Sequence, residues 1–236
     1  MKRSKTLHLM FMLGILLACI VLTQIRSKSH SVSKVEVYFK EKEAQFLDVE
    51  IVNKLLIQSN DSLFFQQKDM VALNKIEQQL LDHPVIKSAE LYTVPDGKLH
   101  IEIEERLPIV RIQADSSFYL DETGKEMPLS DRFTAKVPLF YGALKEENMQ
   151  ALVQLISKLS SDAFLAAEVI DFQWKNSAFV LGLRSYPFEV IWGEDKAFEQ
   201  KAEKLKRFCA FTLENKEKEF NRINLTYDKQ VVARHN

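Results

Sequence analysis

The sequence predicts an α+β protein with an N-terminal transmembrane helix, a small strand–helix–helix–strand–strand unit, and a larger mixed-β unit with two amphipathic helices. Three observations lead to this fold class. Residues 7–25 form an apolar run without charged side chains. Helical and alternating apolar patterns follow one another from residue 34 to residue 110. Short strand patterns and two amphipathic stretches then fill residues 111–236.

Residues 7–25, LHLMFMLGILLACIVLTQI, are expected to form the membrane helix. A helix of this length reaches about 28 Å, close to the thickness of a bilayer's hydrocarbon core. Lysine and arginine flank both ends, so their distribution favours an inside N-terminus only weakly. We expect residues 1–6 to be a short cytoplasmic tail and residues 26–33 a polar linker before an external body.

Three other interpretations of residues 7–25 compete with an anchor. A cleaved signal peptide has a similar charged start and apolar core, but TQIR offers no small residues before a cut. A lipoprotein would be modified at Cys19, although Leu17 is bulky and the apolar run continues past the cysteine. A buried core helix should show a polar face, which this stretch lacks.

Composition narrows the function classes. Charged residues make up 28% of the chain, and the formal net charge is −1. The chain therefore lacks the excess of positive charge that attracts proteins to nucleic acid. The only two cysteines, Cys19 and Cys209, lie far apart in the sequence. We therefore expect neither a disulfide bond nor a metal site built from cysteines. An exported body without disulfides fits a bacterial envelope at least as well as a eukaryotic secreted setting.

The first folded unit is expected at residues 34–110. Asp48 is a candidate N-cap for its first helix, and Pro95-Asp96-Gly97 has the composition of a hairpin turn. In the return strand, Leu99, Ile101 and Ile103 alternate with polar residues, so one face should be buried. The expected elements are a strand at 34–40, helices at 46–58 and 68–81, and hairpin strands at 85–94 and 98–113.

The second unit is expected at residues 111–236. Apolar residues recur at helical spacing in two stretches, with Cys209 on the inward side of the later one. The expected elements are short strands near 118–124 and 137–142, a helix at 145–159, strands at 169–174, 178–184 and 188–192, a helix at 195–213, and one last strand at 222–234.

No residues of this sequence form a recognisable catalytic motif, so we expect no enzyme activity, cofactor or metal ion. Glu102, Glu104 and Glu105 form the densest carboxylate cluster, and His100 shares a strand face with the first two. Acid–base catalysis or a cation site is one interpretation of this cluster. Their alternation with apolar residues favours the solvated side of a half-buried hairpin. The histidines lack metal-ligand spacing, and there is no glycine-rich phosphate loop.

Several motifs in this order resemble the FtsQ/DivIB family of bacterial cell-division proteins. They are the N-terminal anchor, the strand–helix–helix–hairpin unit, VIKSAELYTVPDGKLHIEIEERLPIVRI, FYLDETGKEM, VPLFYG and INLTYDKQVVAR. Together they extend over nearly the whole chain. The resemblance implies a POTRA domain at 34–110 and a β domain with helices on one face at 111–236. It also implies a single span across the cytoplasmic membrane, with the N-terminus on the cytoplasmic side and the body in the periplasm or outside.

The resemblance also implies a function. It predicts a non-enzymatic scaffold of the divisome at the midcell septum, which holds FtsB- and FtsL-like partners and the septal wall synthase complex. In the family, late strands of the β domain receive a strand from FtsB, and residues 224–234 match that segment. The implied partner-binding residues are Asn224, Thr226, Tyr227, Gln230, Val231, Val232, Ala233 and Arg234.

The chemistry of a terminal strand agrees with that role. Its unpaired N–H and C=O groups are all satisfied when a partner strand is added. The family often has an acid and an arginine where Asn224 and Thr226 stand, so this chain departs from the family at those charges. The other interpretation of Tyr227 and Val231 is that they are ordinary strand residues that pack the second domain, since few interface residues dominate binding. The alternative function is a membrane-anchored envelope chaperone or enzyme that uses a POTRA-like recognition module.

Overall fold

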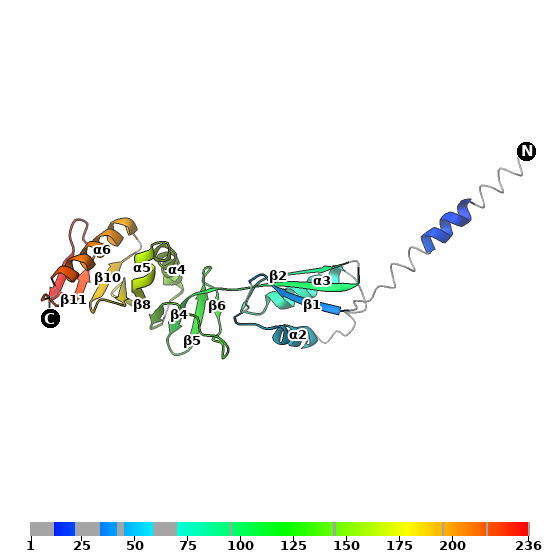
Figure 1. The fold of residues 1–236 in the computed structure, drawn as a ribbon, viewed down its shortest axis with the longest axis horizontal. Helices are drawn as coiled ribbons and strands as arrows, with labels where there is room; N and C mark the ends of the chain where they lie inside the picture. Colours follow the sequence, from blue (N-terminus) through cyan, green and yellow to red (C-terminus); the bar gives the residue numbers. More distant parts are fainter. Residues whose placement is uncertain are drawn as a thin grey trace, which may run out of the picture. The chain divides into compact units, whose positions relative to one another are not determined.

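The computed structural model describes residues 12–21, 34–41, 45–58, 70–94, 96–143, 145–194, 196–215 and 217–235. These residues divide between two compact units, Met1–Glu105 and Arg106–Asn236. Figure 1 labels the elements of both units along the chain.

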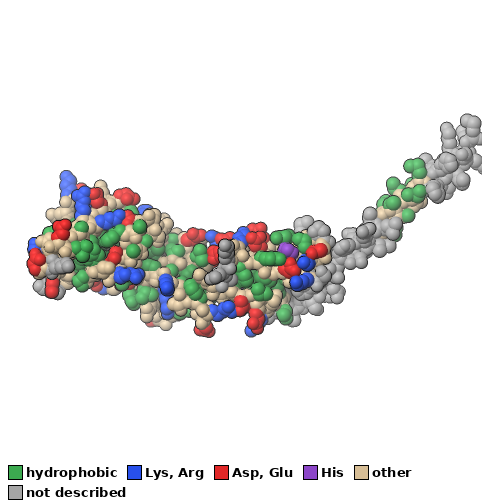
Figure 2. Space-filling view, in the orientation of Figure 1, with side chains coloured by type: hydrophobic (Ala, Val, Ile, Leu, Met, Phe, Trp, Pro, Cys, Tyr) green, Lys and Arg blue, Asp and Glu red, His purple; other side chains and the backbone are tan. Residues whose placement is uncertain are grey.

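The predicted membrane helix is described only in part. Residues 12–21 are helical, and most of their exposed side chains are hydrophobic (Figure 2). Among the described helices, none has the length and apolar character that crossing a membrane requires. The rest of the predicted span, the tail at 1–6 and the linker at 26–33 lie outside the described residues.

The first unit packs two helices against a three-stranded sheet (Figure 1). Its strand order is β1-β3-β2, with β1 parallel and β2 antiparallel to the central strand. Val52 and Leu80 from the helices and Ile101 and Ile103 from β3 are almost fully buried. The elements are β1 (Lys34–Phe39), α2 (Val49–Gln58), α3 (Met70–Leu81), β2 (Ile86–Thr93) and β3 (Lys98–Glu105).

Local sequence signals of the first unit are confirmed. The Asp48 carboxylate accepts from the N–H of Ile51 at 2.7 Å, as an N-cap does. Gly97 has φ +86°, the conformation that favours glycine in the hairpin turn. In β3, Leu99, Ile101 and Ile103 are buried on the side opposite the polar residues.

The predicted return strand at 98–113 is wrong as a single element. β3 ends at Glu105, and β4 (Pro108–Gln113) pairs with β5 and β7 in the sheet of the second unit. The two units therefore divide between Glu105 and Arg106, a few residues before the predicted boundary at 110. Pro108 has no N–H to donate, which explains why the ladder of β3 does not continue through it.

The second unit is a nine-stranded sheet of order β12-β11-β10-β9-β8-β7-β4-β5-β6. Helices α4 (Glu146–Ser160), α5 (Ala163–Glu168) and α6 (Phe198–Glu214) pack against one core with its strands (Figure 1). The remaining strands are β5 (Ser117–Asp121), β6 (Glu126–Met127), β7 (Leu139–Tyr141), β8 (Val169–Lys175), β9 (Ala178–Leu183), β10 (Glu189–Gly193), β11 (Phe220–Asn224) and β12 (Val232–His235).

The core of this unit lies between the helices and one face of the sheet. Phe140, Phe172, Phe179 and Trp192 are its largest buried side chains, and Cys209 of α6 faces it as predicted. Large aromatic residues contribute the most buried apolar area per side chain, so these residues anchor the helices to the sheet.

The last predicted strand, 222–234, is also wrong as a single element. The structure has a hairpin there, in which β11 and β12 run antiparallel and residues 225–231 connect them. β11 lies between β10 and β12, so the part of the predicted strand at 222–224 is inside the sheet. The border of the sheet is β12.

Candidate partner-binding site

The eight predicted partner-binding residues fall on three parts of this hairpin. Asn224 ends β11 inside the sheet. Thr226, Tyr227, Gln230 and Val231 belong to the connection. The other three lie on the border strand: Val232, Ala233 and Arg234.

Strand β12 is the open edge at one end of the sheet. Within the described residues, β11 is its only neighbouring strand. Val232 keeps 43% of its surface accessible. A strand with one partner leaves alternate N–H and C=O groups free on its other side, so β12 can accept another strand.

The two sides of β12 differ. Val231 and Ala233 pack against the core below the helices. Val232 and Arg234 alternate with Ala233 and therefore lie on the opposite, open face of the sheet. Both are exposed.

An ion pair stands next to this edge on the open face. Arg222 of β11 donates from Nε and Nη2 to Oε2 of Glu189 on β10, at 3.1 and 2.6 Å. Lys175 of β8 adds a contact to the other oxygen at 3.6 Å. The arginine hydrogen bond lowers the pKa of Glu189 below its ordinary value. Arg222 is thus neutralised by a neighbour in the same sheet.

Arg234 has no such neighbour. It pairs in register with Arg222, so two like charges stand across the β11–β12 ladder. Among the described residues, its guanidinium makes no hydrogen bond or ion pair. Like charges directly opposite each other destabilise a strand pair.

The connection between β11 and β12 is held against α6. The Asn224 side-chain oxygen accepts from the N–H and hydroxyl of Thr226, at 2.9 and 2.7 Å. The carbonyl of Tyr227 accepts from Nζ of Lys204 at 2.5 Å. The Tyr227 ring itself is 47% exposed and therefore available as an aromatic contact.

Two hollows flank the hairpin. One, of about 400 Å³, is lined by α6 and by the connection at 225–228. The other, of about 620 Å³, is lined by Tyr186, Phe188, Leu213 and Phe220. His235 stacks on Phe220 with 4.5 Å between ring centroids, which places the end of β12 beside the second hollow.

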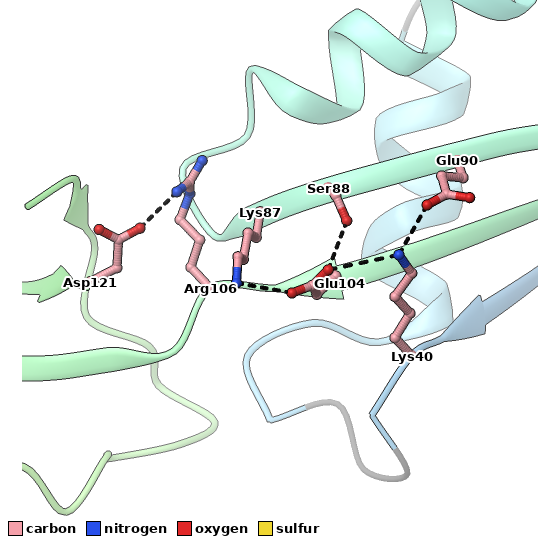
Figure 3. Close-up of polar contacts among 7 residues, drawn as sticks. All are labelled: Lys40, Lys87, Ser88, Glu90, Glu104, Arg106 and Asp121. Carbon is pink, nitrogen blue, oxygen red and sulfur yellow. Dashed lines mark hydrogen bonds and ion pairs between the residues drawn. The ribbon is translucent and has the colours of Figure 1, made fainter. Parts of the chain in front are cut away.

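Glu104, in the carboxylate cluster of the first unit, forms ion pairs with two lysines. Glu104 lies 3.1 Å from Lys87 and 3.8 Å from Lys40, and it accepts from the hydroxyl of Ser88 (Figure 3). These contacts lower its pKa, with the Lys87 hydrogen bond as the largest cause. A carboxylate held ionised in this way is a poor general acid.

Glu105 differs from the solvated role expected for the cluster. It is 3% exposed and accepts from the backbone N–H groups of Gln45 at 2.8 Å and Leu47 at 2.6 Å, with Phe46 between them. The alternating pattern of β3 could not indicate that Glu105 is buried and hydrogen-bonded, because its backbone donors lie some sixty residues earlier in the sequence. Glu105 fixes the segment that precedes α2.

Asp121 is a second buried carboxylate, in the second unit. It accepts from Nη1 of Arg106 at 2.7 Å (Figure 3) and from the Thr123 hydroxyl at 2.6 Å. Desolvation opposes its ionisation, but these hydrogen bonds prevail and lower its pKa. Asp121 therefore closes the turn of the FYLDETG motif. Over the described part of the chain, no group of three metal-ligating side chains is found.

Comparison with known proteins follows the same division of the chain. A POTRA-like domain matches residues 30–104, and the family described as FtsQ/DivIB, C-terminal related, matches residues 107–234. A cell division protein FtsQ of Rhodothermus marinus is 31% identical over 182 residues, which are 67% of this chain and 64% of that protein. The chain thus spans less than two thirds of this relative.

A solved structure is also similar. It is the major extracytoplasmic domain of the cell division protein DivIB of Geobacillus stearothermophilus, in its trans isomer. The match is 16% identical and covers 48% of this chain and 96% of that domain, with a TM-score of 0.32, too low to add to the assignment. The FtsQ/DivIB match at 107–234 extends over more than half of the sequence. By this match, the chain belongs to the FtsQ/DivIB family.

Proposed function

We propose that this chain is a cell-division protein that works as a scaffold of the bacterial divisome. In this role it recruits FtsB- and FtsL-like partners for septal wall synthesis and catalyses no reaction itself. Partners are recruited by strand addition to β12. Membership of the FtsQ/DivIB family supports the division role.

The observation that carries the proposal is the free side of β12. β12 is the last strand at one end of a nine-stranded sheet. The connection that precedes it is held by the hydrogen bond from Lys204 to the Tyr227 carbonyl. A partner strand gains backbone hydrogen bonds without displacing any described element. The backbone hydrogen bonds of strand addition need no particular side chain, which fits a chain that lacks the family's frequent acid and arginine at Asn224 and Thr226.

The proposal includes a membrane anchor at residues 7–25 and a body in the periplasm or outside the cell. It rests on the uncharged apolar run in the sequence. Fractionation of cells that express the full chain tests it: alkaline carbonate should leave the protein in the membrane pellet. Release into the supernatant would remove the anchor from the proposal.

Two proline variants test the edge. Val231 precedes β12, so a proline there leaves the ladder intact, and the informative positions are Val232 and Ala233. Successive N–H groups of a strand point to opposite sides. One of the two prolines therefore removes the outward donor, and the other removes a bond to β11.

We expect the variant that loses the outward donor to keep the melting temperature of the unaltered chain. In live cells, its fluorescent fusion should nevertheless lose the midcell band. Lys145→Ala, at a side chain 76% exposed, is the matched control and should localise normally. Midcell bands of unchanged intensity in both proline variants, with both folded, would exclude strand addition at β12.

A further inference from the structure

The open face of the second sheet carries a row of charges that ends at β12. Glu189 on β10 is in register with Arg222 on β11, and Arg222 is in register with Arg234 on β12. In the first pair, Arg222 donates two hydrogen bonds to one oxygen of Glu189. The second pair sets two positively charged residues opposite each other in the β11–β12 ladder. From inside the sheet to its border, the row therefore reads negative, positive, positive.

A second row lies beside it and is mostly apolar or neutral. Gln173 is in register with Val180, Val180 with Ile191, and Ile191 with Asn224. Asn224 is in register with Val232, which ends the row at the border. Val180, inside the sheet, is 6% exposed, whereas Val232, at the border, is 43% exposed. Val232 is therefore the apolar residue of this row whose surface remains accessible to a partner strand.

We infer that the strand received by β12 carries an acidic side chain opposite Arg234 and an apolar side chain opposite Val232. This rests on the proposed strand addition and specifies its partner. The two partner positions lie two residues apart on the same face, whether the added strand runs parallel or antiparallel. The partner is thus a segment with an acid–any–apolar pattern in either direction.

Charge complementarity is the argument for the acid. The carboxylate of Glu189 is committed to Arg222, so it does not compensate Arg234. An acidic residue on the added strand, opposite Arg234, places a negative charge next to the unpaired positive one. The row then ends in a pair of opposite charges. Cross-strand pairs of opposite charge stabilise, and a lysine in that position repels. The same arginine therefore rejects basic strands.

The test adds a strand to the full chain itself. A glycine placed after Asn236 creates Asn-Gly, the preferred pair for a two-residue hairpin turn. The first residue after the glycine then faces His235, the second faces Arg234, and the fourth faces Val232. Three extensions share valine in the fourth position and threonine elsewhere, and they differ only in the second position: Glu, Thr or Lys.

The readout is amide hydrogen exchange of residues 232–235. We expect protection in the order Glu, Thr, Lys, with about a three- to tenfold difference between the Glu and Lys extensions. Salt at about 1 M should reduce that difference, because exposed charges are then screened within about 3 Å. In the Arg234→Glu chain the order should invert, so that the Lys extension protects best.

The outcomes separate the two proposals. Exchange at 232–235 that is as fast with every extension as without one shows that β12 accepts no strand, and it overturns the proposed function. Equal protection by all three extensions supports strand addition and overturns the charge rule. The same conclusion holds if Arg234→Glu leaves the order unchanged. Protection in the expected order, inverted by Arg234→Glu, supports the acid–any–apolar pattern.

Discussion

Arg222 reaches across the parallel β10–β11 pair and donates two hydrogen bonds to a single oxygen of Glu189. Without this pair, two arginines would adjoin the edge of the sheet uncompensated. The pair therefore determines which charge the edge presents, and its strength depends on pH.

Glu189→Gln should lower the free energy of unfolding by about 0.5 kcal/mol at pH 7, because the pair is partly exposed. The pKa of Glu189 is lowered in the folded chain. Its contribution is present above the carboxyl's ordinary pKa and is lost as pH falls through the lowered one. Urea unfolding at a series of pH values should thus show the two chains converging in acid. Glu203→Gln, at the exposed i,i+4 pair with Arg207, is the control and should change little.

Gly182→Ala should destabilise the second unit by about 1–3 kcal/mol, because the new Cβ would overlap the carboxylate of Asp171 across the strand pair. Combining it with Asp171→Ala should recover most of the loss. Thermal melts of the two single variants and the double variant measure the coupling. Additive losses would show that the two residues do not share this space.

Asp171→Asn should stabilise the chain at neutral pH. Burial, with the charge of Glu189 adding to it, raises the pKa of Asp171. A raised carboxyl pKa means that stability is present below the ordinary value and is lost as pH rises through the raised one. The gain in melting temperature should therefore shrink as the pH is lowered to about 3. A gain that is constant with pH would contradict this cause.

Glu105→Gln should accelerate amide exchange in residues 45–47 more than in β3. The carboxylate accepts from three successive backbone N–H groups, and hydrogen bonds to a charged acceptor are worth about 1.5–3 kcal/mol each. Glu102→Gln, at the partly exposed neighbour on β3, is the control and should leave these amides unchanged. Equal exchange in both variants would contradict the role of Glu105.

Cys209 should not react with thiol reagents until the second unit unfolds. It is 1% exposed, and burial raises the pKa of its thiol to about 12. In a Cys19→Ser chain, we expect no labelling at pH 8 in buffer and one label per chain in urea. Labelling in buffer at the rate of a free thiol would show that the core opens at α6.

The amphipathic elements were predictable because each repeats a pattern over many residues. The helix expected at 145–159 lies at Glu146–Ser160, and the one expected at 195–213 lies at Phe198–Glu214. Burial of one face enforces such patterns, so they survive in the sequence. The FtsQ/DivIB resemblance is confirmed on the same basis, since its motifs are spread over both units.

Short and non-local features were not predictable. Helix α5 has six residues and starts at the Asp162 cap soon after α4, which is too short for a periodic signal. The turn between β11 and β12 contains no glycine or proline, so the stretch resembled one strand. The border position of β12 and the isolation of Arg234 come from strand order, and strand order depends on contacts far apart in the sequence.

The order of strands in the first unit bears on mechanics. The chain enters the sheet at Lys34, the start of β1, and leaves it at Glu105, the end of β3, and these two strands are parallel neighbours paired from Lys34–Lys98 to Phe39–Ile103. Tension between those two points pulls the strands past each other lengthwise and loads every bond of the ladder at once. Zipper-like opening, one bond after another, is not available in that direction. The unit should therefore transmit pulling force as a stiff link.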